Sequence, residues 1–455
     1  MWPEPVLRIL AGAGDRTVFE DGPLEVSGAE MSAMVRRIAA GMRADGIGPG
    51  DGVVLSLGVD APAFAAILAA FAVGARVSGV RPDQLDHVLA AGGGTLIDDA
   101  RVRVLLQSGD EPLTPAGRGD DIARIIYTSG STGVPKGCCQ TYAAMTAAWA
   151  AHPDRWPPAI RDLAARLQRF LVFGSLTSQV MLEYGILALA AGGRLVVAAK
   201  PVFPAAIVEY RATASVITVG KLHQLVRSHP EPMPTLGALM VSGSPLEPGR
   251  LAEALEVLGP VIFHGYGQTE TGMIAMVTPE EMLATPSVLA SVGRPPPSVE
   301  VKVKDGELYV RTPAQASSYW QDPALTAEVF TDGWVRTRDL GHLDPDGYLH
   351  LTGRARDVII VHAELIHAGA VERILATDPS VAEAYVIGRP HPDSGEAVHA
   401  FIVPTAGRTA DPAALTALVT AHLGAKATPT TVTLIDQVPT APSGKPDKAA
   451  LATHL

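Results

Sequence analysis

Hydrophobic and polar residues alternate along the chain in blocks that predict helices and strands in turn. Ser27-Gly-Ala-Glu30 has the composition of a helix capping box. Apolar residues follow it at helical spacing, namely Met31, Met34, Val35, Ile38 and Met42. The glycine-rich turn 46–51 leads into the apolar run 53–57, which is typical of a buried strand. Asp60-Ala-Pro62 then begins a helix that is expected to reach about residue 75. Strands and helices joined by short glycine turns indicate a parallel α/β sheet.

The same rhythm recurs over residues 170–200 and 215–263, and the pattern changes near residue 300. The short strands expected from there on are 301–304, 307–311, 348–352, 382–387, 397–403 and 431–434. We place a domain boundary at Arg354 to Asp357. It divides the chain into an N-terminal domain, residues 1–353, and a smaller α+β C-terminal domain of ordinary size, residues 354–455.

Length and composition restrict the class of protein. At 455 residues the chain is too long for one ordinary core, so two or more domains are expected. Hydrophobic residues at 47% and charged residues at 18% indicate a well-packed globular protein. The net charge of −11 argues against nucleic acid as a partner, because phosphate backbones attract basic surfaces.

The N-terminus, the long apolar stretches and the cysteines all bear on the cellular location of the protein. The N-terminus lacks the pattern of a signal peptide, and the apolar stretches 61–75 and 184–199 do not suit a membrane span. The adjacent Cys138 and Cys139 provide neither a disulfide framework nor the spacing of metal ligands, which fits a reducing cytosol. We therefore expect a cytoplasmic protein without a membrane span, whose two cysteines contribute to helix packing.

The segment from Tyr127 to Gly137 carries the clearest chemistry, with the sequence Tyr-Thr-Ser-Gly-Ser-Thr-Gly-Val-Pro-Lys-Gly. A strand that ends in glycines and hydroxyls leaves backbone N–H groups free to point at an anion, and Lys136 adds a mobile positive charge. It is not a Walker A loop, since Pro135 interrupts it and no Gly-Lys-Ser/Thr follows. An ordinary turn is the alternative, but this density of polar groups favours a binding site for nucleotide phosphates.

This loop resembles the signature of the adenylate-forming enzymes, which include acyl-CoA synthetases, peptide-synthetase adenylation domains and luciferases. Further segments are similar to the family's other motifs, in the same order. They are His264 to Glu270 for the aromatic-glycine-threonine-glutamate motif, Asp332 to Asp339 and Gly353 to Asp357 for the ribose and hinge motifs, and Pro442 to Lys445 for the catalytic-lysine motif. The resemblance implies a large N-terminal domain of parallel α/β sheets with a small β-barrel, and a mobile C-terminal domain.

The resemblance also implies an ATP site with Mg²⁺. Its phosphate loop comprises Thr128, Ser129, Gly130, Ser131, Thr132, Gly133, Lys136 and Gly137. Glu270 offers the hard oxygen that Mg²⁺ prefers, and Thr269 is expected to donate to the α-phosphate. Asp339 is suited to the ribose hydroxyls because a carboxylate accepts from both, and Arg354 is implied to contact ribose and phosphate.

Other residues are implied around the nucleotide and the acid. Tyr266 offers a ring against adenine, and Gly267 allows a close approach to the backbone. The remaining nucleotide-binding candidates are Gly243, Ser244, His264, Gly265 and Gln268, and the acid pocket is expected from Phe173, Gly174 and Ser175.

Two residues of the C-terminal domain carry the expected cycle. Lys445 matches the family's catalytic lysine and is implied to bridge the carboxylate and α-phosphate oxygens during adenylation only. Arg356 matches the hinge residue, about which the small domain is implied to pivot so that Lys445 leaves and the acceptor enters.

Departures from the family pattern bear on the substrates. Arg338 stands where a glycine is usual, and could contact a phosphate or point to solvent. Ala363 replaces a glycine of the loop that commonly lines the acceptor tunnel. Gly174 stands where amino-acid-activating members carry an aspartate; because a buried ammonium without a partner is costly, a neutral fatty, aryl or polyketide-like acid is favoured.

The resemblance thus implies ATP-dependent activation of a carboxylic acid to acyl-AMP with release of pyrophosphate, followed by acyl transfer to a thiol, with CoA preferred. A stand-alone enzyme that loads the phosphopantetheine of a carrier protein, or forms an amide with an amine, is an open alternative. An inactive homologue with a binding or regulatory role is a third.

Overall fold

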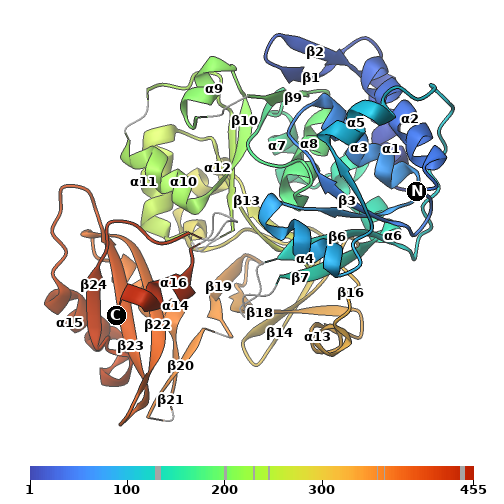
Figure 1. The fold of residues 1–455 in the computed structure, drawn as a ribbon. Helices are drawn as coiled ribbons and strands as arrows, with labels where there is room; N and C mark the ends of the chain where they lie inside the picture. Colours follow the sequence, from blue (N-terminus) through green and yellow to red (C-terminus); the bar gives the residue numbers. More distant parts are fainter. Residues whose placement is uncertain are drawn as a thin grey trace.

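The N-terminal part of the chain is built on two mixed sheets (Figure 1). The computed structural model describes residues 1–128, 135–198, 202–228, 231–243, 246–355, 357–362, 364–440 and 446–454. The first sheet has eight strands, in the order β13 (Gly272–Val277), β12 (Ile262–Gln268), β11 (Ala238–Ser242), β10 (Ala214–Thr218), β8 (Arg169–Val172), β9 (Arg194–Val197), β1 (Thr17–Asp21) and β2 (Leu24–Ser27). Its six inner strands pair in parallel, while β13 and β2 are antiparallel edges.

The second sheet has six strands, in the order β16 (Ser318–Tyr319), β7 (Lys136–Thr141), β6 (Ile122–Thr128), β4 (Arg76–Gly79), β3 (Gly52–Ser56) and β5 (Thr95–Asp98). The strands from β6 to β5 pair in parallel, whereas β7 and β16 are antiparallel. The parallel α/β architecture predicted from the sequence is therefore confirmed. One core cluster spans both sheets, from Trp2 to Met276.

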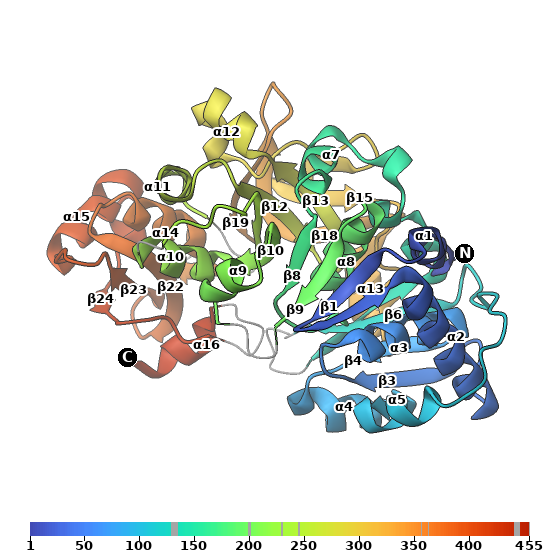
Figure 2. The same cartoon turned by 90° about the horizontal axis from the view of Figure 1, so that it is seen from above.

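Helices cover the faces of these sheets (Figures 1 and 2). They are α1 (Glu4–Ala13), α2 (Gly28–Ala44), α3 (Ala61–Ala72), α4 (Leu85–Ala90), α5 (Asp99–Leu105), α6 (Tyr142–Ala147), α7 (Pro158–Ala164), α8 (Gln179–Ala190), α9 (Ala205–Glu209), α10 (Val219–Arg227), α11 (Pro248–Leu258) and α12 (Pro279–Ala284). The predicted capping box is confirmed, since Ser27 and Glu30 satisfy each other's backbone N–H groups at the start of α2. Asp60 likewise caps α3, which is buried at every position but Pro62.

Cys138 and Cys139 pack against helical residues, as expected, although they themselves lie on a strand: Cys139 shares a buried cluster with Val88, and Cys138 shares one with Leu325 and Val329. Both lie on β7, opposite Ile126 and Ile125 of β6, and both are buried. Burial raises the pKa of each thiol, that of Cys139 to about 11. The segment after the phosphate loop is an antiparallel strand. A short apolar run in a sequence does not by itself show whether the segment forms a strand or a helix.

A third, antiparallel sheet follows, with β14 (Glu300–Lys304), β15 (Glu307–Arg311), β18 (Trp334–Leu343), β17 (Phe330–Thr331) and, paired to β18, β19 (Leu349–Arg354). The helix α13 (Pro323–Val329) precedes β17. The expected strand at 307–311 is confirmed residue for residue, and the one expected at 348–352 begins and ends later.

The smaller C-terminal domain has its own sheet, with β21 (Glu364–His367), β20 (Val358–Val361), β23 (Gly395–Pro404), β22 (Val381–His391) and, paired to β23, β24 (Thr431–Leu434). The helices α14 (Ala368–Ala376), α15 (Pro412–Leu423) and α16 (Lys448–Leu451) accompany it. Its core cluster draws only on residues 359–427. It therefore has a hydrophobic core distinct from that of the large domain, as expected for a separate unit.

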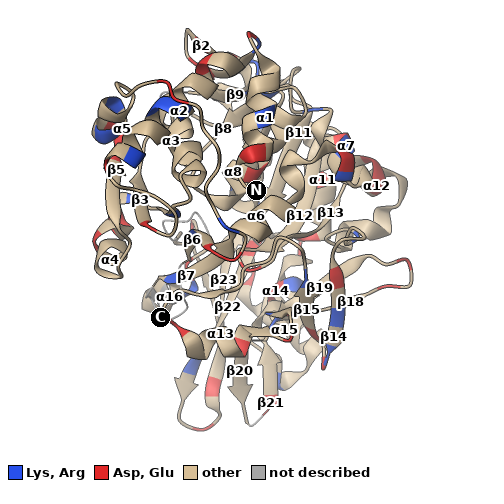
Figure 3. Cartoon of the chain, turned by 90° about the vertical axis from the view of Figure 1, so that its right-hand side faces the viewer, with Lys and Arg blue, Asp and Glu red and all other residues tan. Residues whose placement is uncertain are grey.

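Charges and hydropathy agree with the composition. In the view of Figure 3, Lys and Arg are interspersed with Asp and Glu rather than gathered along one element. No helix among the described segments is long and apolar enough to cross a membrane.

Candidate active site

The predicted phosphate loop joins two paired strands of the second sheet. Thr128 ends β6 and lies opposite Lys136, the first residue of β7; the Thr128 Oγ1 lies 3.4 Å from the Lys136 carbonyl. Ser129, Gly130, Ser131, Thr132 and Gly133 lie outside the described residues. Gly137 has a packing role of its own, since a Cβ there would lie 2.8 Å from Ile125 and 3.0 Å from Trp320.

The predicted adenine and magnesium residues lie in the hairpin of β12 and β13. Tyr266, Gly267 and Gln268 end β12, and Thr269 and Glu270 form the turn to Gly272. The register shifts between Tyr266 and Gly267, and a Cβ on Gly267 would come within 2.4 Å of the Gly272 carbonyl oxygen. The strand pairing itself therefore requires the glycine that we predicted for nucleotide approach.

Asp339 is the centre of a hydrogen-bonded cluster. Its Oδ2 accepts from the Tyr266 hydroxyl and from Gln268 Nε2, both at 2.6 Å. Its Oδ1 lies 3.0 Å from Arg354 Nε across the β18–β19 pair. Burial and the Asp339 charge raise the pKa of Tyr266 well above its usual range, so the phenol stays protonated and donates. The structure thus joins four predicted nucleotide-binding residues that the sequence separates: Tyr266, Gln268, Asp339 and Arg354.

Arg338, next to this cluster, occupies the left-handed backbone region with φ of +60°. This conformation explains why a glycine suits the position, because a side chain there is strained. Its Nη2 lies 2.7 Å from Glu328 Oε1 on α13, and its side chain is 14% exposed. The Arg338 side chain therefore points toward Glu328 and not into solvent.

His264 and Gly265 lie on β12, between β11 and β13. His264 is buried, and burial lowers its pKa to about 4, so the imidazole is neutral at physiological pH. A neutral ring beside the glycine can shape the site but brings no positive charge to a phosphate.

The predicted acid-pocket residues follow the carboxyl end of β8. Phe173 contacts Phe203 edge-on, with ring centroids 5.8 Å apart, and Ser175 Oγ lies 2.7 Å from Thr177 Oγ1. A Cβ built on Gly174 meets nothing within 4 Å. Gly243 follows β11 in the same sheet, and Ser244 lies outside the described residues. Ligands of open α/β sheets bind at this edge, outside the carboxyl ends of parallel strands.

The predicted catalytic lysine and hinge fall outside the described part of the chain, which omits Lys445, Arg356 and Ala363. The neighbouring residues are described. Thr440 and Pro446 form an isolated antiparallel bridge on either side of the lysine motif. Lys448, three residues after Lys445, lies 2.9 Å from Asp357 and 2.8 Å from Glu372.

One residue that our sequence reasoning missed contacts the predicted metal ligand. The Tyr319 hydroxyl donates to Glu270 Oε1 at 2.5 Å. Tyr319 belongs to the two-residue strand β16, too short for an alternation of polar and apolar positions to reveal. The adjacent aromatic residues Tyr319 and Trp320 were the available signal.

The donor set around Glu270 suits a magnesium ion held mainly by a substrate. Among the described residues, no group of three or more His, Cys, Asp or Glu side chains could hold a metal ion. Mg²⁺ does not need such a group, because one or two carboxylates, phosphate oxygens and water complete its shell. The Glu270 carboxylate retains acceptor positions beyond the one that Tyr319 occupies, so it fits this role.

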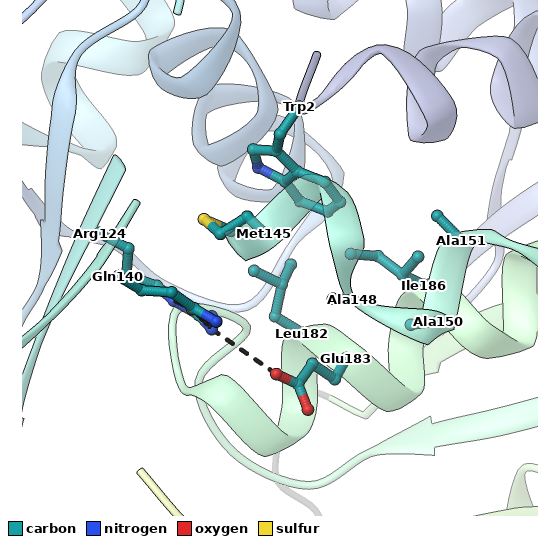
Figure 4. Close-up of a pocket in the computed structure, with 10 residues that line it drawn as sticks. All are labelled: Trp2, Arg124, Gln140, Met145, Ala148, Ala150, Ala151, Leu182, Glu183 and Ile186. Atoms are coloured by element: carbon teal, nitrogen blue, oxygen red, sulfur yellow. Dashed lines mark hydrogen bonds and ion pairs between the residues drawn. The ribbon is translucent and has the colours of Figure 1, made fainter. Parts of the chain in front are cut away.

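A small pocket is lined by other residues (Figure 4). It is bounded by Trp2, Arg124, Gln140, Met145, Ala148, Ala150, Ala151, Leu182, Glu183 and Ile186, of which none was predicted for the site. Arg124 Nη2 lies 3.6 Å from Glu183 Oε1, and burial lowers the pKa of Arg124 and raises that of Glu183. Arg124 also donates to Gln140 Oε1 at 2.6 Å, which fixes the Gln140 amide against β6.

Comparison with known proteins supports the family resemblance. Residues 8–113 and 93–320 match the family described as AMP-binding enzyme, and residues 370–445 match the AMP-binding enzyme C-terminal domain. The chain is 31% identical over 485 aligned positions to a feruloyl-CoA synthase of Amycolatopsis sp, covering 98% of this chain and 96% of the relative. It is 37% identical to the fatty acid–[acyl-carrier-protein] ligase ScoC of Streptomyces coeruleorubidus over 223 positions, which cover 46% and 43% of the two chains. Among solved structures, the amide bond synthetase McbA from Marinactinospora thermotolerans is 33% identical, with a TM-score of 0.84 and 99% of each chain covered.

Proposed function

The chain belongs to the AMP-binding enzyme family and is an adenylate-forming ligase that uses ATP, and we propose that it activates a neutral carboxylic acid to acyl-AMP and transfers the acyl group to a thiol, with CoA preferred. The observation that carries this proposal is that the predicted ribose residues and the predicted metal ligand lie in one region. Gln268 donates to Asp339, while Glu270, two residues later, accepts from Tyr319 on the strand that pairs with β7. The ribose candidate, the metal candidate and the strand that begins with Lys136 therefore meet in one region.

Adenylation forms a bond between a carboxylate oxygen of the acid and the α-phosphorus, and it breaks the bond to pyrophosphate. Negative charge grows on the α-phosphoryl oxygens and on the leaving diphosphate, so positioning and positive charge supply most of the catalysis. We assign the β- and γ-phosphates to residues 128–137, with Lys136 as the point charge, and the ribose to Asp339 and Arg354. Mg²⁺ held by Glu270 would neutralise part of the triphosphate charge. Thr269 would donate to the α-phosphate.

The proposed acid is neutral apart from its carboxylate. Gly174 offers open space and no carboxylate to pair with an α-ammonium, and Phe173 adds apolar surface. We therefore propose fatty, aryl or polyketide-like acids. The similarity to a feruloyl-CoA synthase supports an aryl acid and CoA within this class.

Transfer to a carrier protein or to an amine is the second candidate for the later half-reaction. Two observations favour it: the 33% identity to an amide bond synthetase across 99% of both chains, and the similarity to an acyl-carrier-protein ligase. The first half-reaction is the same in both cases, and only the nucleophile that attacks the acyl-AMP differs.

Two assays test the proposal in sequence. Purified protein is incubated with ATP, Mg²⁺ and a panel of fatty, aryl and α-amino acids, and pyrophosphate release is recorded. We expect release with one or more neutral acids and none with α-amino acids. CoA, a phosphopantetheinylated carrier protein or simple amines are then added with the best acid, and products are identified by mass spectrometry. Failure to consume ATP with every acid would refute adenylation, and a sole amide product would refute the thiol acceptor.

We further propose that the two half-reactions use different placements of the small domain, with the boundary at 354–357 and the pivot at Arg356. Figures 1 and 2 place α16, which begins three residues after Lys445, on the side of the small domain that faces the large one. Figure 1 and Figure 3 show the β20–β21 hairpin at the lower end of the molecule. We propose that this placement of the small domain belongs to the half-reaction that needs Lys445, because α16, which follows the lysine motif, faces the large domain.

Polar contacts with helices α10 and α11 hold the small domain in this arrangement. Glu383 of β22 lies 2.9 Å from Arg227 Nη2 and 3.8 Å from His223 Nδ1. Burial raises the pKa of the Glu383 carboxyl, but His223, Tyr385 and Arg227 outweigh burial and lower it to about 2. Glu383 therefore stays charged at physiological pH. Arg250 of α11 donates to the Val381 carbonyl and, at 2.9 Å, to Thr405 Oγ1.

Loosening this contact is expected to affect the half-reactions unequally. The Arg227→Ala variant removes an ion pair worth about 1 kcal/mol, so ATP–pyrophosphate exchange should fall roughly fivefold relative to acyl transfer from preformed acyl-adenylate. Arg43→Ala is the matched control, because Arg43 pairs with Glu111 at 3.3 Å within the large domain. Both rates should be unchanged in the control. A parallel loss of the two rates in Arg227→Ala would argue against a role of this contact in the cycle.

A further inference from the structure

Residues 312–320, here called the bridging segment, connect the Glu270 turn with the strand after the phosphate loop. On one side, Thr312 Oγ1 donates to the Thr271 carbonyl at 2.9 Å, and the Ala316 N–H donates to the Glu270 carbonyl at 2.8 Å. On the other side, the Ser317 N–H donates to the Cys139 carbonyl at 2.8 Å, and the Trp320 N–H to the Gly137 carbonyl at 2.7 Å. One short segment therefore fixes the position of the Glu270 turn relative to β7, and both border the proposed ATP site.

The bridging segment is itself anchored in the core. Gln140 Nε2 donates to the Ala314 carbonyl at 2.5 Å, and Gln140 is in turn held by the buried Arg124. Tyr319 packs against Phe330 with ring centroids 5.5 Å apart, and only 7% of its surface is exposed. The phenol consequently has little freedom to move away from Glu270.

We propose that Tyr319 is a positioning residue that orients the Glu270 carboxylate toward the cation bound to the ATP phosphates. Its hydroxyl fixes Oε1, which leaves the remaining acceptor positions of the carboxylate for the cation. Partners that orient a ligating carboxylate commonly change metal affinity by about 10- to 100-fold when they are removed. The inference rests on the proposed function of Glu270.

The Tyr319→Phe variant tests this inference, since it keeps the ring and removes only the hydroxyl. Mn²⁺ is titrated into protein saturated with a non-hydrolysable ATP analogue, and free Mn²⁺ is measured by electron paramagnetic resonance. We expect Mn²⁺ affinity to fall roughly tenfold, and the Mg²⁺ concentration for half-maximal pyrophosphate exchange to rise by a similar factor. Tyr348→Phe is the matched control, because that hydroxyl lies 3.4 Å from Glu281 on the large domain. It should bind Mn²⁺ as the unaltered protein does.

A double-mutant cycle with Glu270→Gln separates positioning from a purely structural role. If Tyr319 acts through the carboxylate, Tyr319→Phe should change Mn²⁺ affinity little in the Glu270→Gln background. Unchanged Mn²⁺ affinity in Tyr319→Phe, or an equal loss in both backgrounds, would overturn the inference. Should the unaltered protein release no pyrophosphate with any acid, the proposed function would fail, while the Mn²⁺ titration would still decide on Tyr319.

Discussion

Replacing Asp339 with asparagine is expected to lower kcat/KM for ATP by roughly 10- to 100-fold, because a hydrogen bond to a charged group contributes about 1.5–3 kcal/mol. The asparagine keeps the shape and one carbonyl oxygen, so Tyr266 can still donate to it. It loses the second acceptor oxygen, which holds Arg354 Nε at 3.0 Å and which we assign to a ribose hydroxyl. Calorimetric ATP binding and pyrophosphate exchange measure the effect.

Asp339→Ala is expected to affect folding as well. It leaves the buried phenol of Tyr266 without its Asp339 acceptor and removes one of the two acceptors of Gln268 Nε2, which keeps the Thr337 carbonyl at 3.0 Å. The free energy of unfolding should therefore fall by about 3 kcal/mol. Denaturant unfolding of both variants therefore distinguishes a lost ribose contact from a damaged fold. Asp344→Asn provides the control, since Asp344 lies in the turn between β18 and β19 and pairs with His350 at 3.0 Å. Equal ATP affinity in Asp339→Asn and the unaltered protein would contradict the ribose assignment.

Local features of the fold could be predicted from local sequence. The capping box at Ser27, the cap at Asp60 and the strands at 307–311 and 431–434 all depend on residues close in the chain. Hydrophobic period and capping chemistry are properties of such short windows. The strand that contains Cys138 and Cys139 was not predicted, because it is set by pairing with β6 and not by its own pattern.

The site depends on contacts between distant segments, which explains what the sequence alone did not reveal. Motif resemblance indicated Tyr266, Glu270 and Asp339, but not that Tyr266 donates to Asp339 or that Tyr319 donates to Glu270. Likewise, Arg338 could have faced a phosphate or solvent, and its pairing with Glu328 follows from the placement of α13. Side-chain partners of this kind require the sheet order and register, which no single segment specifies.

The larger of the two effects is expected for Lys445. Lys445→Ala should slow ATP–pyrophosphate exchange by roughly 10²- to 10³-fold, the cost of removing one preorganised group that stabilises transition-state charge. The lysine is assigned to the carboxylate and α-phosphate oxygens in the first half-reaction only. The second half-reaction, started from synthetic acyl-adenylate and CoA, should therefore proceed at nearly the unaltered rate.

The asymmetry between the half-reactions is what distinguishes a catalytic lysine from a structural one. Lys426→Ala, which removes an exposed lysine of the same domain paired with Glu364, should leave both rates unchanged. If Lys445→Ala slowed both half-reactions equally, the lysine would serve the fold or the domain contact rather than adenylation. If Lys445→Ala slowed only adenylation, and Arg227→Ala slowed adenylation less strongly, both variants would act on the same placement of the small domain. The contacts of Glu383 would then stabilise the placement in which the Lys445 ammonium meets the triphosphate.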